Sequence, residues 1–427
     1  MQRFRRLKAL PLSAAALLAA LMAPSAVVAQ EPDSARIAEL ERQMEAVSRE
    51  LERMRLGQDV VVADSSVLGL GPAASRVYRI DQGVSIGGYG EILYENYATE
   101  AEDGATAGPA DRFDALRAII YVGYKFSDRL LFNSEIEVEH GDEIFLEFAY
   151  VDYMLRDGLG VRAGLLLAPV GLVNELHEPS TYLGTERPLV ETRIIPTTWR
   201  ENGIGLFGGT DAFAWRAYLM NSFDAAGFNG SGLRGGRQKG STALSEDLGV
   251  AARLDYVAVP GLIVGGSSYV GETAQNRTDT SGEEIGGRTL IWEGHVDYKW
   301  RGWDLRALVA GSSVDQAAEL NELNGLTGTE GIGTRMLGWY GQAGYDVLRS
   351  TGSTHQLIPY ARYEQIDTQL ETAAGFTANG VNDGSAVLLG VAWKPAPQVV
   401  AKVDYQLHSN AANTGVDQVN FQLGWLF

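Results

Sequence analysis

From residue 83 onward, apolar residues recur at every second position in segments of about ten residues, and turn-forming residues separate the segments. Two of the clearest segments are residues 290–300 and residues 399–408, in which large apolar side chains alternate with charged or polar ones. A two-residue period places successive side chains on opposite faces of an extended strand. The pattern therefore predicts β-strands with one apolar and one polar face.

The spacing of these segments predicts a closed barrel. Sixteen segments begin near residues 84, 113, 130, 143, 159, 202, 213, 247, 262, 288, 303, 334, 354, 384, 399 and 417. Short turns alternate with mostly long links, the longest being residues 168–200; the exception is a very short link near Gly141. A soluble sandwich typically has about seven to nine strands, whereas outer-membrane barrels combine an even strand number with short turns and long loops. We expect residues 83–427 to be all-β: a transmembrane antiparallel β-barrel of about 16 strands.

Aromatic residues lie beside the short turns and at the end of the chain. They are Phe126, Trp300, Trp303, Trp393, Trp425 and Phe427. Outer-membrane barrels have short turns on the periplasmic side and aromatic girdles at both interfaces, so this placement predicts periplasmic short turns and a periplasmic N-terminus. The alternation continues to Phe427, which matches the aromatic-ended signal that outer-membrane proteins present to the barrel assembly machinery. We expect that machinery and the outer-membrane lipid as partners.

Residues 1–29 have the features of a secretory signal peptide. Four cations, at Arg3, Arg5, Arg6 and Lys8, precede an apolar run over about residues 9–22, and small residues follow at Val27 and Ala29. The run is too short to favour a membrane anchor. We expect the mature chain to begin near Gln30 and to reside in the outer membrane of a Gram-negative bacterium.

Residues 30–56 contain an a/d heptad stripe made of Ile37, Leu40, Met44, Val47, Leu51 and Met54. Charged residues fill most other positions, so a periplasmic coiled coil explains the stripe better than a helix lying on a core. A helix this short is marginal alone, which favours a role in joining copies of a homo-oligomer, with a trimer as the working hypothesis. Residues 57–82 lose the heptad and are expected to be a linker with room for one short strand.

The composition removes several classes of function. There is no cysteine, which excludes disulfides, thiolate metal sites and cysteine nucleophiles. The formal net charge of −19 argues against a nucleic-acid partner, because phosphate binding requires clustered Lys and Arg. Of the five histidines, His140 and His177 lie beside glutamates, but no nucleophile spacing singles out either one, and His177 with Glu178 offers too few ligands for a metal. We expect no catalytic residue, no metal and no cofactor.

The polar face of residues 130–140 carries three carboxylates in a row, on Glu135, Glu137 and Glu139. At the spacing of about 7 Å between alternate strand residues, two carboxylates repel by roughly 0.6 kcal/mol in water but roughly 2.4 kcal/mol at a dielectric constant of 20. The row therefore predicts a wet interior, that is, a water-filled channel. A regular hairpin sets Arg117 opposite Glu139 and Tyr121 opposite Glu135. The expected pore-lining residues are Arg117, Lys125, Glu135, Glu137, Glu139 and Arg162, with an ordinary solvated wall position as the alternative for each.

The link of residues 168–200 is long and contains several apolar residues, so it is expected to be ordered and functional. One interpretation is a loop folded into the barrel that narrows the pore; the other is an external loop packed at a subunit contact. Its charged residues, the candidate constriction residues, are Glu175, Glu178, Glu186, Arg187, Glu191, Arg193 and Arg200.

Three runs around this link, residues 164–172 (GLLLAPVGL), 186–189 (ERPL) and 203–206 (GIGL), resemble motifs of the phosphate-selective porin O and P family of Gram-negative bacteria. The resemblance implies sixteen strands, a trimer and a third external loop folded inward as a constriction, here residues 168–200. Arg187 is the charged constriction residue matched within the motif. The family's basic ladder and lysine ring have no visible counterpart, so cation, neutral-solute and weakly selective transport also remain compatible with the residues.

Together these observations predict an outer-membrane porin. It would let small hydrophilic solutes or ions, including anions such as phosphate, diffuse passively through a water-filled barrel narrowed by an inward-folded loop. The alternatives are an outer-membrane β-barrel enzyme and a non-conducting structural barrel.

Overall fold

A computed structural model describes residues 69–427. The predicted signal peptide, the predicted coiled coil and the first part of the predicted linker lie outside these residues. Within the described residues, no helix has the length and apolarity needed to cross a membrane.

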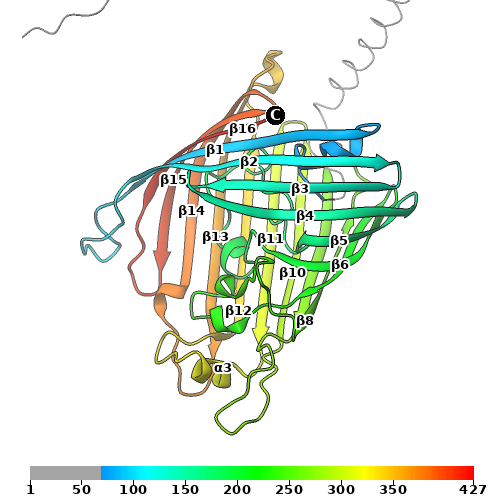
Figure 1. Cartoon of the computed structure of the whole chain (residues 1–427). Coiled ribbons are helices and arrows are strands. Elements are labelled where there is room, and N and C mark those ends of the chain that lie inside the picture. Colours follow the sequence, from blue (N-terminus) through cyan, green and yellow to red (C-terminus); the bar gives the residue numbers. More distant parts are fainter. Residues whose placement is uncertain (1–68) are drawn as a thin grey trace, which may run out of the picture. The chain divides into compact units, whose positions relative to one another are not determined.

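Sixteen antiparallel strands form one closed barrel, in which each strand pairs with its sequence neighbours and β16 pairs with β1 (Figure 1). The strands are β1 (Gly83–Tyr97), β2 (Arg112–Ser127), β3 (Leu130–Glu139), β4 (Glu143–Arg156), β5 (Leu159–Leu167), β6 (Arg200–Gly209), β7 (Phe213–Asn221), β8 (Leu248–Tyr256), β9 (Leu262–Gly271), β10 (Thr289–Trp300), β11 (Trp303–Val314), β12 (Gly333–Tyr345), β13 (Gln356–Thr372), β14 (Asp383–Ala396), β15 (Val399–Asn410) and β16 (Gln418–Leu426). Short helices occur in the connections: α2 (Val190–Arg193), α3 (Ala317–Leu323), η2 (Ala74–Arg79), η3 (Ala225–Gly227), η4 (Arg234–Gly236), η5 (Arg349–Thr351) and η6 (Gly380–Asn382).

The predicted barrel is confirmed in strand number and closure. Every predicted strand start lies within two residues of the observed one. The register of the β2–β3 hairpin is also as predicted, with Arg117 opposite Glu139 and Tyr121 opposite Glu135. The two-residue turn between β10 and β11 holds Arg301 and Gly302 at φ values of 49° and 86°. Positive φ at both positions is the geometry that matches the twist of a tight hairpin.

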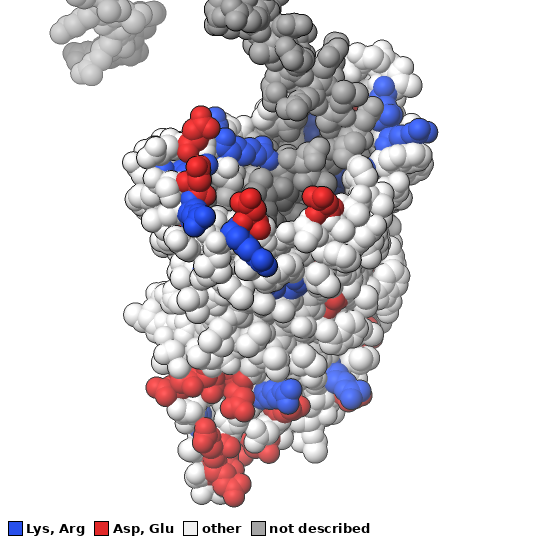
Figure 2. Space-filling view, turned by 90° about the vertical axis from the view of Figure 1, so that its right-hand side faces the viewer, with Lys and Arg blue, Asp and Glu red and all other residues white. Residues whose placement is uncertain are grey.

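The outer face of the barrel is apolar. Trp292 and Leu389 are 44% and 53% exposed, although they lie in the middle of their strands. Phe126, Trp300, Trp303, Trp393 and Phe427 are also exposed on this face, at the short-turn end. Figure 2 shows charged side chains gathered at the two ends, with few between them. An apolar band between charged ends is what a bilayer requires of a barrel.

The N-terminal segment, which we define as residues 69–82, packs against interior-facing side chains of the barrel. Its 3-10 helix η2 occupies residues predicted to be a linker with room for a strand. Leu70, Ala73, Ala74 and Val77 are each at most 7% exposed. The small side chains that gave this stretch the composition of a linker are the ones that allow it to pack closely against the wall.

Candidate functional site

The β5–β6 loop (residues 168–199) bonds to interior-facing side chains around the barrel wall. It contacts Glu135 on β3, Arg216 on β7, Ser267 on β9, Arg306 on β11, Tyr340 on β12, Glu364 on β13, Lys394 on β14, Asp404 on β15 and Gln422 on β16. Most of these contacts use backbone groups or charged side chains of the loop. Because buried polar groups are costly unless they are paired, this set of contacts fixes the path of the loop.

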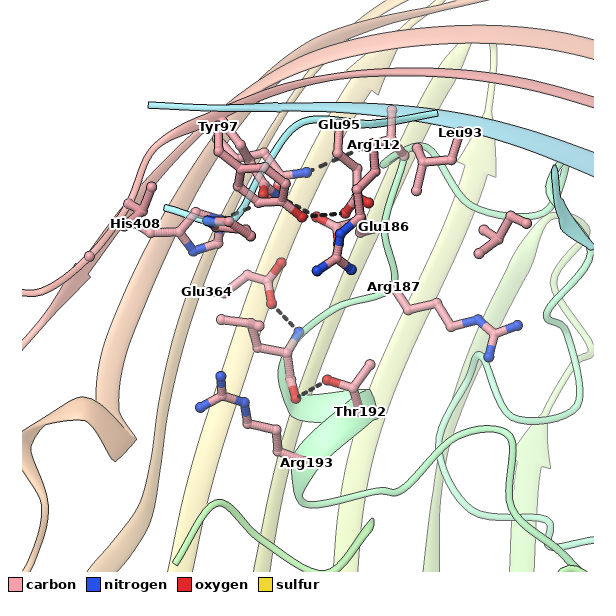
Figure 3. Close-up of a pocket in the computed structure, with 18 of the residues that line it drawn as sticks. Leu93, Glu95, Tyr97, Arg112, Glu186, Arg187, Thr192, Arg193, Glu364 and His408 are labelled. Carbon is pink, nitrogen blue, oxygen red and sulfur yellow. Dashed lines mark hydrogen bonds between the residues drawn. The ribbon is translucent and has the colours of Figure 1, made fainter. Parts of the chain in front are cut away.

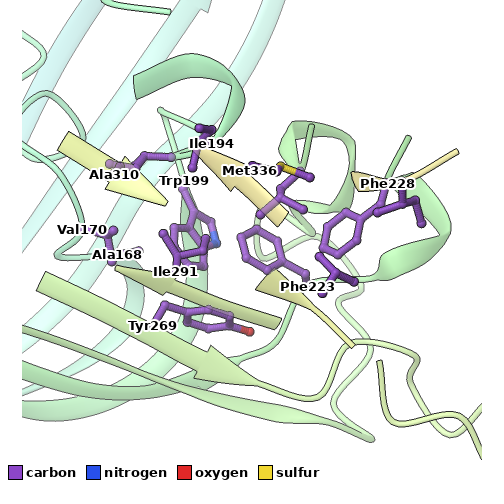
Figure 4. Close-up of a cluster of buried hydrophobic side chains, with 14 of the residues drawn as sticks. Ala168, Val170, Ile194, Trp199, Phe223, Phe228, Tyr269, Ile291, Ala310 and Met336 are labelled. Carbon is purple, nitrogen blue, oxygen red and sulfur yellow. The ribbon is translucent and has the colours of Figure 1, made fainter. Parts of the chain in front are cut away.

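The base of the loop is held by a hydrophobic cluster at the long-loop end of the barrel (Figure 4). Trp199 is fully buried; its ring stacks on Phe223 at a centroid distance of 4.4 Å and meets Tyr269 edge-on at 4.9 Å. Ile194 and Val190 from the same loop are also fully buried in the cluster. Apolar burial of this kind stabilises a fully buried side chain by roughly 1.5–3 kcal/mol.

A network of buried ion pairs lies on the other side of the loop. Glu175 accepts hydrogen bonds from Arg216 at 3.0 and 2.5 Å. Arg253 pairs with Asp255 at 2.8 Å, and His295 bonds to Asp255 at 3.0 Å. All of these side chains are at most 8% exposed. They form a continuous polar network with little access to water.

A cavity of about 630 Å³ opens at the long-loop end and is bounded by the β5–β6 loop (Figure 3). Its wall includes Leu93 and Tyr97 from β1, and Tyr182 from the loop. Six arginines contribute to the wall: Arg112, Arg117, Arg187, Arg193, Arg234 and Arg362. Four acidic residues join them: Glu95, Asp114, Glu186 and Glu364.

The unpaired charges of this cavity are mostly positive. Arg117 and Arg362 form ion pairs with glutamates, as does His140 with Asp114. Among the described residues, four cavity arginines have no carboxylate within 4 Å: Arg112, Arg187, Arg193 and Arg234. Of the four cavity carboxylates, only those of Glu95 and Glu186 have no cationic side chain within 4 Å among the described residues. The cavity lining thus holds more unpaired cations than unpaired anions.

Arg187 is the most unusual of these groups. Its guanidinium extends away from the loop backbone (Figure 3), and its buried Nη2 atom has no hydrogen-bond partner. An unsatisfied buried donor costs about 1–3 kcal/mol, more when it is charged. A group of this kind is suited to bind an anionic or hydrogen-bond-accepting solute.

Burial alters the pKa values of several loop residues at the cavity. Burial, together with the nearby Glu95 and Asp404 carboxylates, raises the pKa of the Glu186 carboxyl to about 7. Burial lowers the pKa of Arg193, and it lowers the pKa of Arg234 to about 10, still well above neutral pH. Near pH 7 Arg234 is therefore charged, while Glu186 is close to its titration point.

The predicted pore-lining residues all face the interior, but they do not gather at one site. Arg117 reaches the cavity wall and lies 3.5 Å from Glu91, and 3.6 Å from both Glu137 and Glu139. Arg162 is 3% exposed and bonds to Asp152 and Tyr78, while Lys125 donates to the Ile80 carbonyl. Their role as pore-lining residues remains a prediction.

The expectation of water around the glutamate row is wrong for two of its three members. Glu135 and Glu137 are 0% and 3% exposed. Glu135 lies 3.1 Å from His177 of the β5–β6 loop, and Glu137 lies near Arg117. Partners from other segments, which the spacing along one strand does not reveal, accompany these two carboxylates. Glu139 alone is partly exposed.

The seven candidate constriction residues of the β5–β6 loop and the start of β6 separate into two groups. Glu186, Arg187 and Arg193 line the cavity. The others are buried against partners: Glu175 with Arg216, Glu178 with the backbone of Ala73 and Ala74, Glu191 with Tyr340, and Arg200 with Glu147. Arg112 and Arg234 also line the cavity but were not predicted, because neither lies in a periodic pattern that marks it as facing this site.

Two carboxylates flank one histidine of the barrel interior. His295 lies between Glu293 and Asp255, and the Ser267 hydroxyl donates to Glu293 and not to the imidazole. Within residues 69–427, no group of three or more His, Asp or Glu side chains is placed to hold a metal ion.

Comparison with known proteins first supports the fold. No model of a known protein family matches the chain. Two solved structures of OmpT, an outer membrane protein of Vibrio cholerae, superimpose with TM-scores of 0.52: its loop L8 deletion mutant and its in-vitro folded trimer form. Each is 10% identical and covers 82% of this chain and all of the other. At that identity the likeness shows a shared barrel fold of outer-membrane proteins.

A sequence relative gives the family. The chain is 36% identical over 375 residues to a protein of Aquifex aeolicus (strain VF5) described only as an uncharacterized protein, and the match covers 84% of this chain and 83% of that protein. Identity at this level over most of both chains indicates common descent. The chain therefore belongs to the same protein family as this Aquifex aeolicus protein.

Proposed function

We propose that the chain is an outer-membrane porin that lets small hydrophilic solutes diffuse passively through its barrel, with a preference for anions such as phosphate. The closed barrel with an apolar outer band supports the membrane location. The predicted signal peptide and the aromatic residues at the short-turn end support an outer membrane with the short turns toward the periplasm.

The observation that carries the proposal is the cavity with its unpaired arginines. Two unit charges 4 Å apart attract by about 4 kcal/mol at an effective dielectric constant of 20. An anion beside Arg187 therefore gains stabilisation that a cation does not, and Arg234, whose charge interacts with that of Arg187, adds to it. Arg is also well suited to phosphate, since its planar fork can donate two hydrogen bonds at once.

The β5–β6 loop is the proposed constriction. Its bonds to strands around the wall support an inward path, which narrows the route below the cavity. Glu186, Arg187 and Arg193 would then meet a solute as it leaves the cavity. The buried loop residues Glu175, Glu178 and Glu191, together with Arg200 at the start of β6, would instead hold the constriction in place.

We infer three copies per assembly. The heptad of residues 30–56 would join the copies on the periplasmic side, and the Vibrio cholerae structure with the same fold includes a trimer form. The barrel assembly machinery is the proposed partner during biogenesis, because β16 carries the alternating row of apolar and aromatic residues Phe421, Leu423 and Trp425. We propose no enzymatic role, since the interior acids and histidines are engaged with one another.

Reconstitution in planar lipid bilayers tests the function. We expect stepwise single-channel conductance and, in a potassium chloride gradient, a reversal potential of the sign given by anion preference. Addition of phosphate should reduce the chloride current if both anions use the cavity. A pure, correctly folded protein without conductance would contradict the porin and favour a structural barrel. A reversal potential of the opposite sign would retain the porin but reject anion preference.

A further inference from the structure

The N-terminal segment (residues 69–82) covers interior side chains that would otherwise face the lumen. Its buried apolar residues pack on Tyr89, Tyr121, Phe148, Tyr150, Leu166 and Tyr218. These side chains belong to β1, β2, β4, β5 and β7, and all are at most 3% exposed. On the opposite half of the wall, the β5–β6 loop similarly covers Arg362, Lys402 and Asp404, which are 1–3% exposed. The two segments together thus exclude water from interior side chains on both halves of the barrel.

Polar contacts fix the N-terminal segment to the wall. The Tyr78 hydroxyl donates to Asp152 at 2.7 Å and accepts from Arg162 at 2.8 Å. Asn133 donates to the Ala74 carbonyl at 2.9 Å. The segment thus has a specific seat, which is not expected of a random linker.

The segment also supports the β5–β6 loop directly. The Glu178 carboxylate accepts hydrogen bonds from the backbone N–H groups of Ala73 and Ala74, each at 3.0 Å. A Cβ atom added at Gly71 would collide with the same carboxylate. The two segments therefore meet without spare room, and the glycine permits the close approach.

The two segments differ in how they are attached. The β5–β6 loop continues into a strand at each end, whereas the described part of the N-terminal segment joins the barrel wall only at Gly83. A segment tethered to the wall at one end can leave its seat by breaking non-covalent contacts, without unpairing any strand.

We propose that residues 69–82 are a removable plug, which closes the lumen beneath the β5–β6 loop and must withdraw for solutes to pass. This inference rests on the proposed porin function and adds a means of regulating the same pathway. The plug keeps the barrel closed while it is seated, and the cavity of the long-loop end then has no outlet.

A disulfide that joins the N-terminal segment to the barrel wall tests the plug. The protein has no native cysteine, so only the two introduced cysteines of one chain can form it within the molecule. A Cβ atom built on Gly123 lies 2.7 Å from the Cβ of Val77. A disulfide requires about 3.8 Å between these atoms, so the Val77→Cys and Gly123→Cys pair needs a shift of about 1 Å. The matched controls are the two single-cysteine variants under the same oxidising and reducing conditions.

We expect the oxidised double-cysteine protein in planar bilayers to show no current above that of the protein-free bilayer. Reduction of the same sample should restore the wild-type conductance, and neither single-cysteine control should respond to the redox change. Equal conductance of the oxidised and reduced forms, with the disulfide verified by mass spectrometry, would overturn the plug.

A deletion of residues 70–80 in the full chain provides a second test, with folding checked by the heat-modifiable mobility of the barrel on gels. We expect a larger single-channel conductance and fewer closing events than in the wild type. An unchanged conductance would overturn the plug and leave the porin intact. Silence of every form, the deletion variant included, would overturn the porin itself and the plug with it.

Discussion

The β5–β6 loop and the N-terminal segment both bond to the barrel interior, but they are attached to it in different ways. The loop joins strands at both ends, contacts side chains around the whole wall and includes a buried ion pair between Glu175 and Arg216. The segment uses small apolar side chains, a few hydrogen bonds and a single covalent link to the wall at Gly83. The β5–β6 loop is therefore anchored in place, whereas the N-terminal segment is held in its seat only by non-covalent contacts that can break and re-form.

The largest effect is expected from removal of the β5–β6 loop, which is joined to strands at both ends. Replacement of residues 174–192 by a short Gly-Ser linker should raise the single-channel conductance several-fold, because it removes the contacts that cross to the far strands. Removal of residues 279–283, at the exposed tip of the β9–β10 connection, is the matched control and should leave the conductance unchanged. If the loop replacement also leaves it unchanged, the loop is not a constriction.

The next test concerns the ion pair that anchors the loop. Arg216→Met removes both hydrogen bonds to buried Glu175 and leaves Arg253, at 3.8 Å, as its remaining cation, so it should lower the free energy of unfolding by about 3 kcal/mol. The double variant Arg216→Met with Glu175→Gln should recover much of that loss, since the poorly paired buried carboxylate is then gone. Urea unfolding in detergent micelles measures both. A loss below about 1 kcal/mol for Arg216→Met would show that this side of the loop is not firmly anchored.

A smaller effect is expected on the cavity side of the same loop. Arg187→Glu replaces an unpaired cation by an anion, so it should shift the reversal potential toward cation preference with little change in stability. Arg335→Glu is the control, because Arg335 is exposed and does not line the cavity. Equal shifts in both variants would mean that net charge, and not the cavity, sets the selectivity.

The smallest expected effect is a pH dependence. Because burial raises the pKa of Glu186 to about 7, this carboxyl is mostly neutral at pH 6 and mostly charged at pH 8. Anion preference should therefore decrease as the pH rises through about 7. Reversal potentials measured across this range should show the step in the wild type and lose it in Glu186→Gln. A step that persists in the variant must come from another group.

The barrel could be predicted from the sequence because alternation reports directly on the two faces of each strand. The sixteen strands and the pairing of Arg117 with Glu139 follow from local spacing and turn length. Alternation shows that a side chain points into the barrel, but it does not show which residues that side chain contacts there. The partner of Glu135 is His177, 42 positions further along the chain, which the spacing within one strand does not reveal.

The candidate site was predicted only in part, for the same reason. Arg187 and Arg193 could be found because they belong to an unusually long link, and both line the cavity. Arg234 reaches that cavity from a different loop with no periodic signal. The seat of the N-terminal segment could not be predicted either, since short runs of Ala, Gly and Ser carry the same composition in a free linker and in a tightly packed segment.

The pairing of β16 with β1 has a consequence for assembly. The barrel wall around the N-terminal segment is continuous only once β16 has paired with β1. No lateral opening then remains between paired strands. The segment must therefore either be enclosed as that seam forms or enter afterwards through one mouth of the finished cylinder. If the segment is enclosed as the barrel closes, a newly folded molecule begins with a plugged lumen. If the segment enters afterwards, the molecule begins with an open one.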